Sequence, residues 1–342
     1  MTRTNLKRLA SLTAFVYLSA MTMVIASERV YWYVGGISVE SIFGIGIFYM
    51  IPALAVLWAL GSGPSQSLHQ VILGGAVFAF VVEGVLTFVI YEDGPLPIMA
   101  ALFIGWHGLL SVVGFWYLAR RWLIEQRRLL LSGTAAAMGV YWGVWSIIYR
   151  LPEASEGLEE SFIVMDPGEF TTYALVVGAV LVAAHWLLGW VWPEEYAPIR
   201  GGRIGITLVV GAYFAVAVMP AVIWAPIKLA VLLGGVLWLL KRSRLATPDE
   251  PSVIASLQGR VAFRDAVLLM VLPVTAVVSY SVVWSMDPNE GTTEALFLTM
   301  VATQVVAGLV AIVWAAHRAL ARRPARGSSS VEQPTSSLDM AG

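Results

Sequence analysis

Cysteine is absent from this chain, and charged side chains are scarce. None of the 342 residues is cysteine, which excludes disulfides, thiolate metal sites and cysteine nucleophiles. Charged residues make up 13%, where a soluble domain carries about 25%. The formal net charge of −1 gives no strongly basic surface, so nucleic acid is not an expected partner. These absences exclude most soluble protein classes.

Long apolar runs are what the chain has instead. Hydrophobic residues make up 58% of the sequence, and the mean hydropathy is +0.78. The apolar blocks have the length of helices that cross a hydrocarbon core about 30 Å thick. We therefore expect an all-α polytopic membrane protein with about ten transmembrane helices, surrounded by membrane lipids. The predicted spans are 9–26, 42–60, 69–91, 97–119, 130–149, 170–192, 204–223, 225–240, 266–285 and 294–316.

The basic residues indicate the orientation. If both termini are cytoplasmic, all of the 21 basic residues except Arg29, Arg150 and Lys228 lie in inner segments. Such a bias is typical of the positive-inside rule. We expect a multi-pass protein of the cell membrane with this orientation. Spans 7 and 8 meet at Pro220 and Pro226, and they either cross the membrane as two short helices or only dip into it.

Two segments of the chain resemble each other. DPGEFTTYAL at 166–175 matches DPNEGTTEAL at 287–296, and YWGVWS at 141–146 matches YSVVWS at 280–285. These pairs predict two parallel repeats of four helices, because an even number of spans preserves direction. The predicted parts are an N-terminal helix pair (1–68), a first repeat (69–192), a second repeat (193–323) and a disordered cytoplasmic tail (324–342).

The doubled D-P-x-E motif has a local explanation. Asp166 and Asp287 are each expected to cap a helix, with proline at its first position and glutamate three residues after the cap. Capping alone does not require the Thr-Thr-x-Ala-Leu that follows in both, so that part favours duplication.

Ionisable residues inside apolar spans are the best candidates for a site, because a charge at the bilayer centre costs about 2.5–3.5 kcal/mol. Glu83, His107 and His185 are three such residues. A short turn joins the helices of Glu83 and His107, at similar estimated depths of about 12 and 15 Å. We expect these two side chains to be neighbours able to share a proton, or else to form a structural polar contact.

Polar side chains at a similar depth are candidates to line this site. Tyr141, Tyr280 and Gln304 are the main ones, and Tyr49, Ser146 and Tyr213 are others; ordinary interhelical packing is the alternative for each.

The leading functional hypothesis is a transporter-like or binding protein for a small apolar solute or lipid, with a proton-linked Glu83–His107 site in the outer half of the membrane. It needs no cofactor and no metal. The first alternative is a membrane electron carrier that binds haem b through His107 and His185.

Two further alternatives remain. One is an enzyme acting on a lipid-linked substrate, with Glu83 or His107 as general base and Arg29 or Arg150 holding a phosphate at the outer surface. The other is an accessory subunit without chemistry. No nucleophile elbow, zinc-protease, Walker or dinucleotide motif stands in a fitting context, so the sequence assigns neither a reaction nor an oligomeric state.

Overall fold

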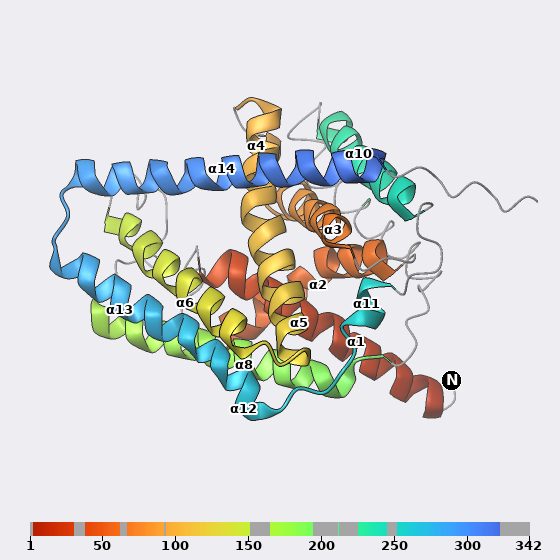
Figure 1. Ribbon diagram of the computed structural model, residues 1–342, viewed down its shortest axis with the longest axis horizontal. Helices are drawn as coiled ribbons and strands as arrows, with labels where there is room; N and C mark the ends of the chain where they lie inside the picture. The colour runs from red at the N-terminus through yellow and green to blue at the C-terminus, as the bar shows by residue number, and fades with distance from the viewer. Residues whose placement is uncertain are drawn as a thin grey trace, which may run out of the picture.

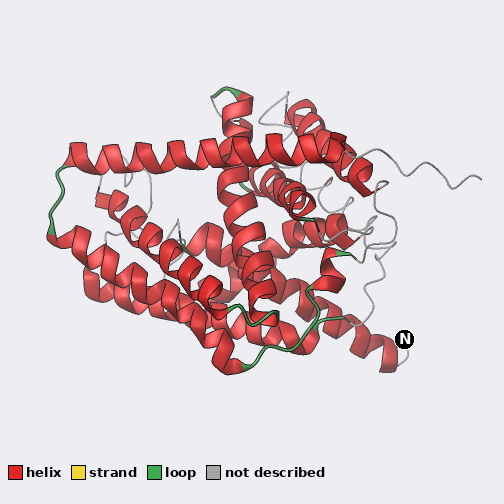
Figure 2. Ribbon diagram, viewed as in Figure 1, coloured by secondary structure: helices red, strands yellow, loops and turns green. Residues whose placement is uncertain are grey.

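The chain folds as a bundle of helices, described here from a computed structural model (Figures 1 and 2). The structure describes residues 3–30, 38–61, 67–91, 94–150, 165–193, 211, 225–244 and 252–321. Within these ranges the regular structure is helical, with no strand. The all-α expectation is confirmed for this part of the chain.

The first half of the chain contains several π-helical segments (η1, η2 and η4) in line with α-helices. Its elements are α1 (Arg3–Val24), η1 (Ile25–Arg29), α2 (Val39–Gly61), α3 (Leu68–Val81), η2 (Val82–Leu86), the short 3-10 helix η3 (Val89–Tyr91), α4 (Leu96–Phe103), η4 (Ile104–Leu118) and α5 (Ala119–Ile124). Because α4, η4 and α5 follow one another without a break, they form one rod through the middle of the molecule (Figure 1).

The second half supplies the helices on either side of this rod. They are α6 (Arg128–Trp145) with the 3-10 turn η5 (Ser146–Arg150), α8 (Pro167–Val191), α10 (Ala225–Arg244), the short α11 (Val253–Ser256) and α12 (Phe263–Ala266), the 3-10 turn η8 (Val267–Met270), α13 (Val271–Ser285) and α14 (Glu290–Ala321). In Figure 1 the long α14 lies across the central rod, and α6, α8 and α13 lie together on one side.

Eight helices in the described ranges are long and apolar enough to cross a membrane. They run over Leu6–Arg29, Glu40–Gly61, Leu68–Leu86, Leu96–Ile124, Arg128–Ile148, Pro167–Val191, Phe263–Ser285 and Glu290–Ala321. Each overlaps one of the ten predicted spans. Predicted span 7 lies almost entirely outside the described residues. Span 8 corresponds to α10, whose two ends carry Lys228, Lys241 and Arg242, and it is not among the eight. The count of ten and the repeat stay predictions.

Large apolar side chains cover the outside of several helices. Val306, Val310 and Val313 on α14 are each about 60% exposed, and α13 exposes Val274 and Val278 in the same way. Water disfavours such continuous apolar faces, whereas lipid accommodates them. The exposed surface therefore fits a multi-pass membrane protein.

Glycines allow the helices to approach closely at their crossings. Gly75 of α3 faces Gly108 of η4, where a Cβ added to Gly75 would lie 2.7 Å from the Gly108 carbonyl oxygen. Gly139 and Gly143 of α6 lie in the same way against the backbone of α13. Small residues four apart are a common means of close packing between membrane helices. These crossings fix the positions of η4 and α6, the helices on which the site and a neighbouring pocket depend.

The two D-P-x-E motifs have different structures. Asp166 caps α8 as predicted: its Oδ1 accepts from the amides of Gly168 and Glu169 at 2.6 and 2.9 Å, and a capping box is complete. The prediction was wrong for Asp287, which has a φ of +44°. An N-cap residue needs extended backbone, so Asn289 takes that role and accepts from the amide of Thr292 at 2.9 Å. The Asp287 carboxylate instead binds Arg150 at 2.6 Å.

This difference predicts unequal effects of alanine substitution. D166A and N289A should each lower the free energy of unfolding by about 1 kcal/mol, because each removes the acceptor that caps a helix. D287A should cost less, since it removes only a partly exposed ion pair. Thermal unfolding in detergent measures the three variants side by side, and a larger loss in D287A than in D166A would contradict the assignment.

Candidate functional site

A buried carboxylate–imidazole pair lies where α3 ends and η4 begins. His107 Nε2 is hydrogen-bonded to Glu83 Oε1, and both side chains are at most 5% exposed. The second oxygen of Glu83 accepts from the hydroxyl of Thr87 at 2.7 Å. The two residues that the sequence predicts as neighbours are thus in contact, and both carboxylate oxygens have partners.

A second buried carboxylate lies beside this pair. The hydroxyl of Tyr49 on α2 donates to Glu28 Oε1, and Glu28 is only 9% exposed. The Glu28 carboxylate is close enough to His107 and to Glu83 to interact electrostatically with both. We call Glu28, Tyr49, Glu83 and His107 the acidic cluster. It joins residues from the first four membrane-compatible helices.

The two glutamates and the histidine of this cluster lie on π-helical turns. Glu28 is in η1, Glu83 in η2 and His107 in η4. A π turn closes i→i+5 hydrogen bonds and is rare, with frequent occurrence at functional sites. Each widened turn changes the direction of the side chains relative to an α-helix. The same unusual geometry thus occurs at three converging positions of this cluster.

The walls around His107 are aromatic. The Trp106 ring stacks on the imidazole with centroids 4.8 Å apart, and its indole nitrogen donates to the Ser27 carbonyl at 3.1 Å. Phe78 of α3 lies on another side, with centroids 6.2 Å apart. The second ring nitrogen of His107, Nδ1, is buried and has no hydrogen-bond partner in the described part of the chain. It therefore has an unused hydrogen-bonding position.

Arg29 is the cation nearest to Glu28 along the chain. It is 2% exposed; its guanidinium donates to the Ser41 carbonyl, and its own carbonyl accepts from the Tyr173 hydroxyl at 2.8 Å. The burial of Arg29 against Ser41 and Tyr173 does not favour the hypothesis in which it holds a phosphate at the outer surface. Arg150, the other residue of that hypothesis, binds Asp287 and lies 4.7 Å over the Trp284 ring.

The remaining predicted lining residues form separate contacts. Gln304 on α14 donates to the Tyr141 hydroxyl on α6 at 2.8 Å. Tyr280 on α13 donates to the Met165 carbonyl at 2.5 Å and stacks on Phe170. These bonds hold helices together, and none of them includes Glu83 or His107. Ser146 bonds the Trp142 carbonyl within its own helix. Tyr213 lies outside the described residues.

His185 lies at a different level of the bundle from His107. Its carbonyl accepts from Arg120 at 2.9 Å, and its imidazole interacts with the backbone of Phe115. Phe115 and Arg120 follow His107 by eight or more residues on the same rod, on the order of 10 Å. A haem iron needs both imidazoles on opposite sides of one plane. This placement, with His107 Nε2 bonded to Glu83, does not favour the haem alternative.

Two sets of buried polar residues were not predicted as candidates from the sequence: Glu28, and the contact of His69 and Gln70 with Ser243. Glu28 ends a long apolar run and therefore resembles the exit of a helix from the membrane; η1 continues that helix and directs the carboxylate inward. His69 and Gln70 on α3 contact the Ser243 hydroxyl of α10 at 2.7 and 2.6 Å. All three are buried, and they connect the ends of two helices. For Glu28, the signal in the sequence is an acidic residue at the end of an apolar run.

No protein family, no curated protein and no solved structure matches this chain. The site therefore has to be interpreted from its own geometry. Within the described residues, no group of three histidine, aspartate or glutamate side chains is arranged to hold a metal ion.

Proposed function

We propose that this chain is a transporter-like or binding protein of the cell membrane, for a small apolar solute or a lipid, with a proton-linked site at Glu83 and His107. The observation that carries the proposal is the burial of two carboxylates, Glu28 and Glu83, around one imidazole. Two ionised carboxylates in one apolar site repel each other, so a proton shared among the three groups stabilises the cluster.

The contacts support a site that changes its protonation state. Glu83 and His107 lie on separate helices, so a proton on either side of their hydrogen bond changes the attraction between α3 and η4. The free Nδ1 of His107 gives the pair a second position for a proton. A solute that binds one protonation state of the pair more tightly than the other would couple its binding to proton movement.

The chemistry of the surroundings favours an apolar ligand. Phe78 and Trp106 flank the imidazole, and the core that surrounds the cluster consists of apolar side chains from α1, α2, α3 and η4. With both termini cytoplasmic, as the basic residues predict, Glu28 and Glu83 belong to the outer half of the membrane. Among the described residues, no contact favours an enzyme or an accessory subunit over this proposal.

Infrared titration tests the proton role without knowledge of the substrate. Protein reconstituted in vesicles is titrated between about pH 4 and pH 9, across the range of carboxyl and imidazole groups. We expect the band of a protonated buried carboxyl to change over this range, and E83Q to remove or shift it. E125Q is the matched control, since Glu125 is about one-third exposed and pairs with arginines.

A transport assay then tests the ligand. Vesicles containing a pH-sensitive dye are exposed to small apolar solutes and to lipid analogues under a pH gradient. Solute-dependent proton movement that E83Q abolishes would support the proposal. Uptake with the same pH dependence in E83Q and in the unmodified protein would contradict the proton role.

A further inference from the structure

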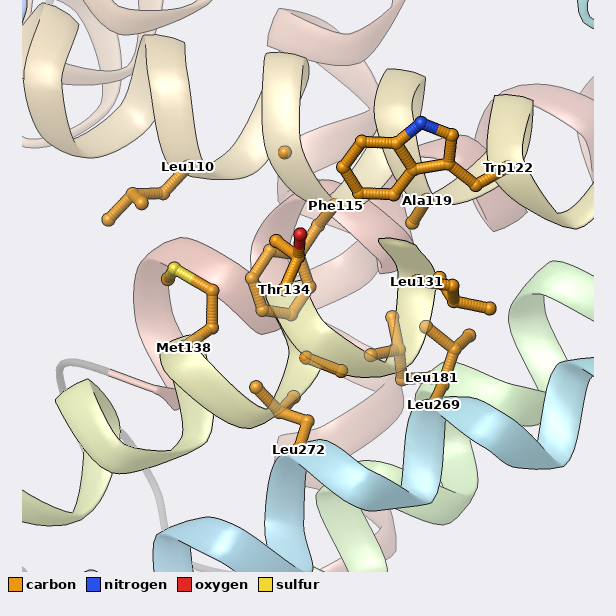
Figure 3. A pocket seen from close by; sticks show the side chains of 12 residues that line it. Leu110, Phe115, Ala119, Trp122, Leu131, Thr134, Met138, Leu181, Leu269 and Leu272 are labelled. Carbon is orange, nitrogen blue, oxygen red and sulfur yellow. The ribbon is translucent and has the colours of Figure 1, made fainter. Parts of the chain in front are cut away.

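A second feature of the fold is an apolar pocket beside the central rod, which shares no lining residue with the acidic cluster (Figure 3). Its cavity volume is about 70 Å³. Sites that enclose a whole small molecule have volumes of roughly 300–1,000 Å³, so this pocket accommodates a segment of a flexible chain rather than a whole ligand. The walls come from the rod, α6, α8 and α13, and they include Leu110, Phe115, Trp122, Leu131, Met138 and Leu272.

The pocket exists because α6 diverges from the rod. The turn at Glu125–Arg127 joins the two, and α5 packs against α6 next to it. Further along, η4 and α6 separate, and small residues on the facing sides, Gly114 and Ala135, leave space between them. Thr134 is exposed and Met138 partly exposed, so the pocket opens at the side of the bundle. Both helices belong to candidate spans, so we expect this opening to lie within the hydrocarbon region.

Arginines gather at the end of the pocket where the turn lies. Arg127 and Arg128 precede the wall residue Leu131 by one helical turn, and each is about half-exposed. Arg128 binds Asp265 at 2.7 Å, one turn before Leu269 of the pocket wall. Arg264 is exposed beside Asp265. Glu125 binds Arg121 and Arg127, each at 2.6 Å. The four arginines at this end therefore exceed its two carboxylates, Glu125 and Asp265, where a bound chain would reach the membrane surface.

We propose that this pocket binds one acyl chain of an anionic membrane lipid, with the lipid phosphate at Arg127, Arg128 and Arg264. An acyl chain matches an apolar pocket that opens sideways into the bilayer. The excess of guanidinium groups at one end matches a phosphate, which arginine binds with charge-assisted hydrogen bonds. The site is separate from the acidic cluster and does not depend on the function proposed for that cluster.

Photolabelling in nanodiscs tests the site. The probe is phosphatidylglycerol with a diazirine in one acyl chain, at a low fraction in phosphatidylcholine. Mass spectrometry should find the label on peptides 110–122 and 131–138. A135W places an indole inside the pocket and should reduce this labelling about tenfold. A137W is the matched control: it adds the same side chain to the same helix at an exposed position outside the pocket wall.

Two further comparisons distinguish between the possible occupants of the pocket. T134F narrows the pocket from its exposed edge, so it gives a second test if A135W does not fold. The same diazirine on phosphatidylcholine should label the pocket much less, and R127Q with R264Q should remove that preference. Equal labelling by the two lipids, or labelling that A135W or T134F leaves unchanged, would overturn the proposal. Cross-linking of the pocket to a co-purified polypeptide would overturn it as well, because the pocket would then be a protein interface.

Discussion

G143L should abolish the folded protein. A Cβ at Gly143 of α6 would overlap the Ala276 carbonyl oxygen and lie 2.7 Å from the Tyr280 backbone nitrogen of α13. Backbone atoms cannot move aside as the end of a side chain can, so the two helices would have to separate. Overpacking of a core costs about 1–3 kcal/mol and occasionally more. We expect the upper end or beyond, because α6 and α13 form the most extensive helix pair among the described elements.

Gly133 provides the control on the same helix. A Cβ at Gly133 meets nothing within 4 Å, and the residue is exposed. G133L should keep or slightly raise stability, since leucine has the higher helix propensity by somewhat under 1 kcal/mol. Size-exclusion chromatography and thermal unfolding in detergent compare the two variants. Equal melting temperatures for G133L and G143L would show that the helices do not cross at Gly143.

H107L should destabilise the protein strongly while E83L/H107L should recover part of the loss. Removing the imidazole leaves the buried Glu83 carboxylate without its partner at Oε1, and an uncompensated buried charge costs about 3–5 kcal/mol. Replacing both partners with leucine removes that charge together with its desolvation penalty. The single and double variants form a cycle whose coupling energy we expect to exceed 1 kcal/mol.

T87V provides a reference value for the free energy of a single hydrogen bond to Glu83. It removes only the 2.7 Å hydrogen bond from Thr87 to the other Glu83 oxygen and should cost about 1 kcal/mol. Unfolding of all four variants in one detergent provides the free energies. Additive effects of E83L and H107L would mean that the two side chains do not interact in the folded state.

Much of the fold follows from the length and apolar character of the runs. Each of the eight membrane-compatible helices overlaps a predicted span, because about 20 apolar residues have few other stable arrangements. The ends of the helices were less predictable. Asp166 and Asp287 stand in the same motif, yet only Asp166 caps its helix, and the Asp287 carboxylate binds Arg150 instead. A local pattern does not contain that tertiary contact.

The candidate site was only partly predictable, because part of it depends on contacts between helices that are distant in sequence. Glu83 and His107 could be paired because a short turn joins their helices and fixes their relative depth. Glu28 could not be placed beside them, because α1 and η4 are distant in sequence and because η1 alters the direction of the last turn. His185 has the same local appearance as His107, and only the packing against Arg120 separates their surroundings.

The π-helical turns also affect the number of residues in their helices. An i→i+5 turn contains one residue more than the α-helical turn in the same place. A single deletion within 25–29 or 82–86 would restore the α-helical register and rotate Glu28 or Glu83 out of the cluster. Distant relatives that have lost the acidic cluster should therefore be recognisable by one-residue gaps at these positions. In relatives that retain it, the spacing between neighbouring helices should be preserved more strictly than the apolar residues around it.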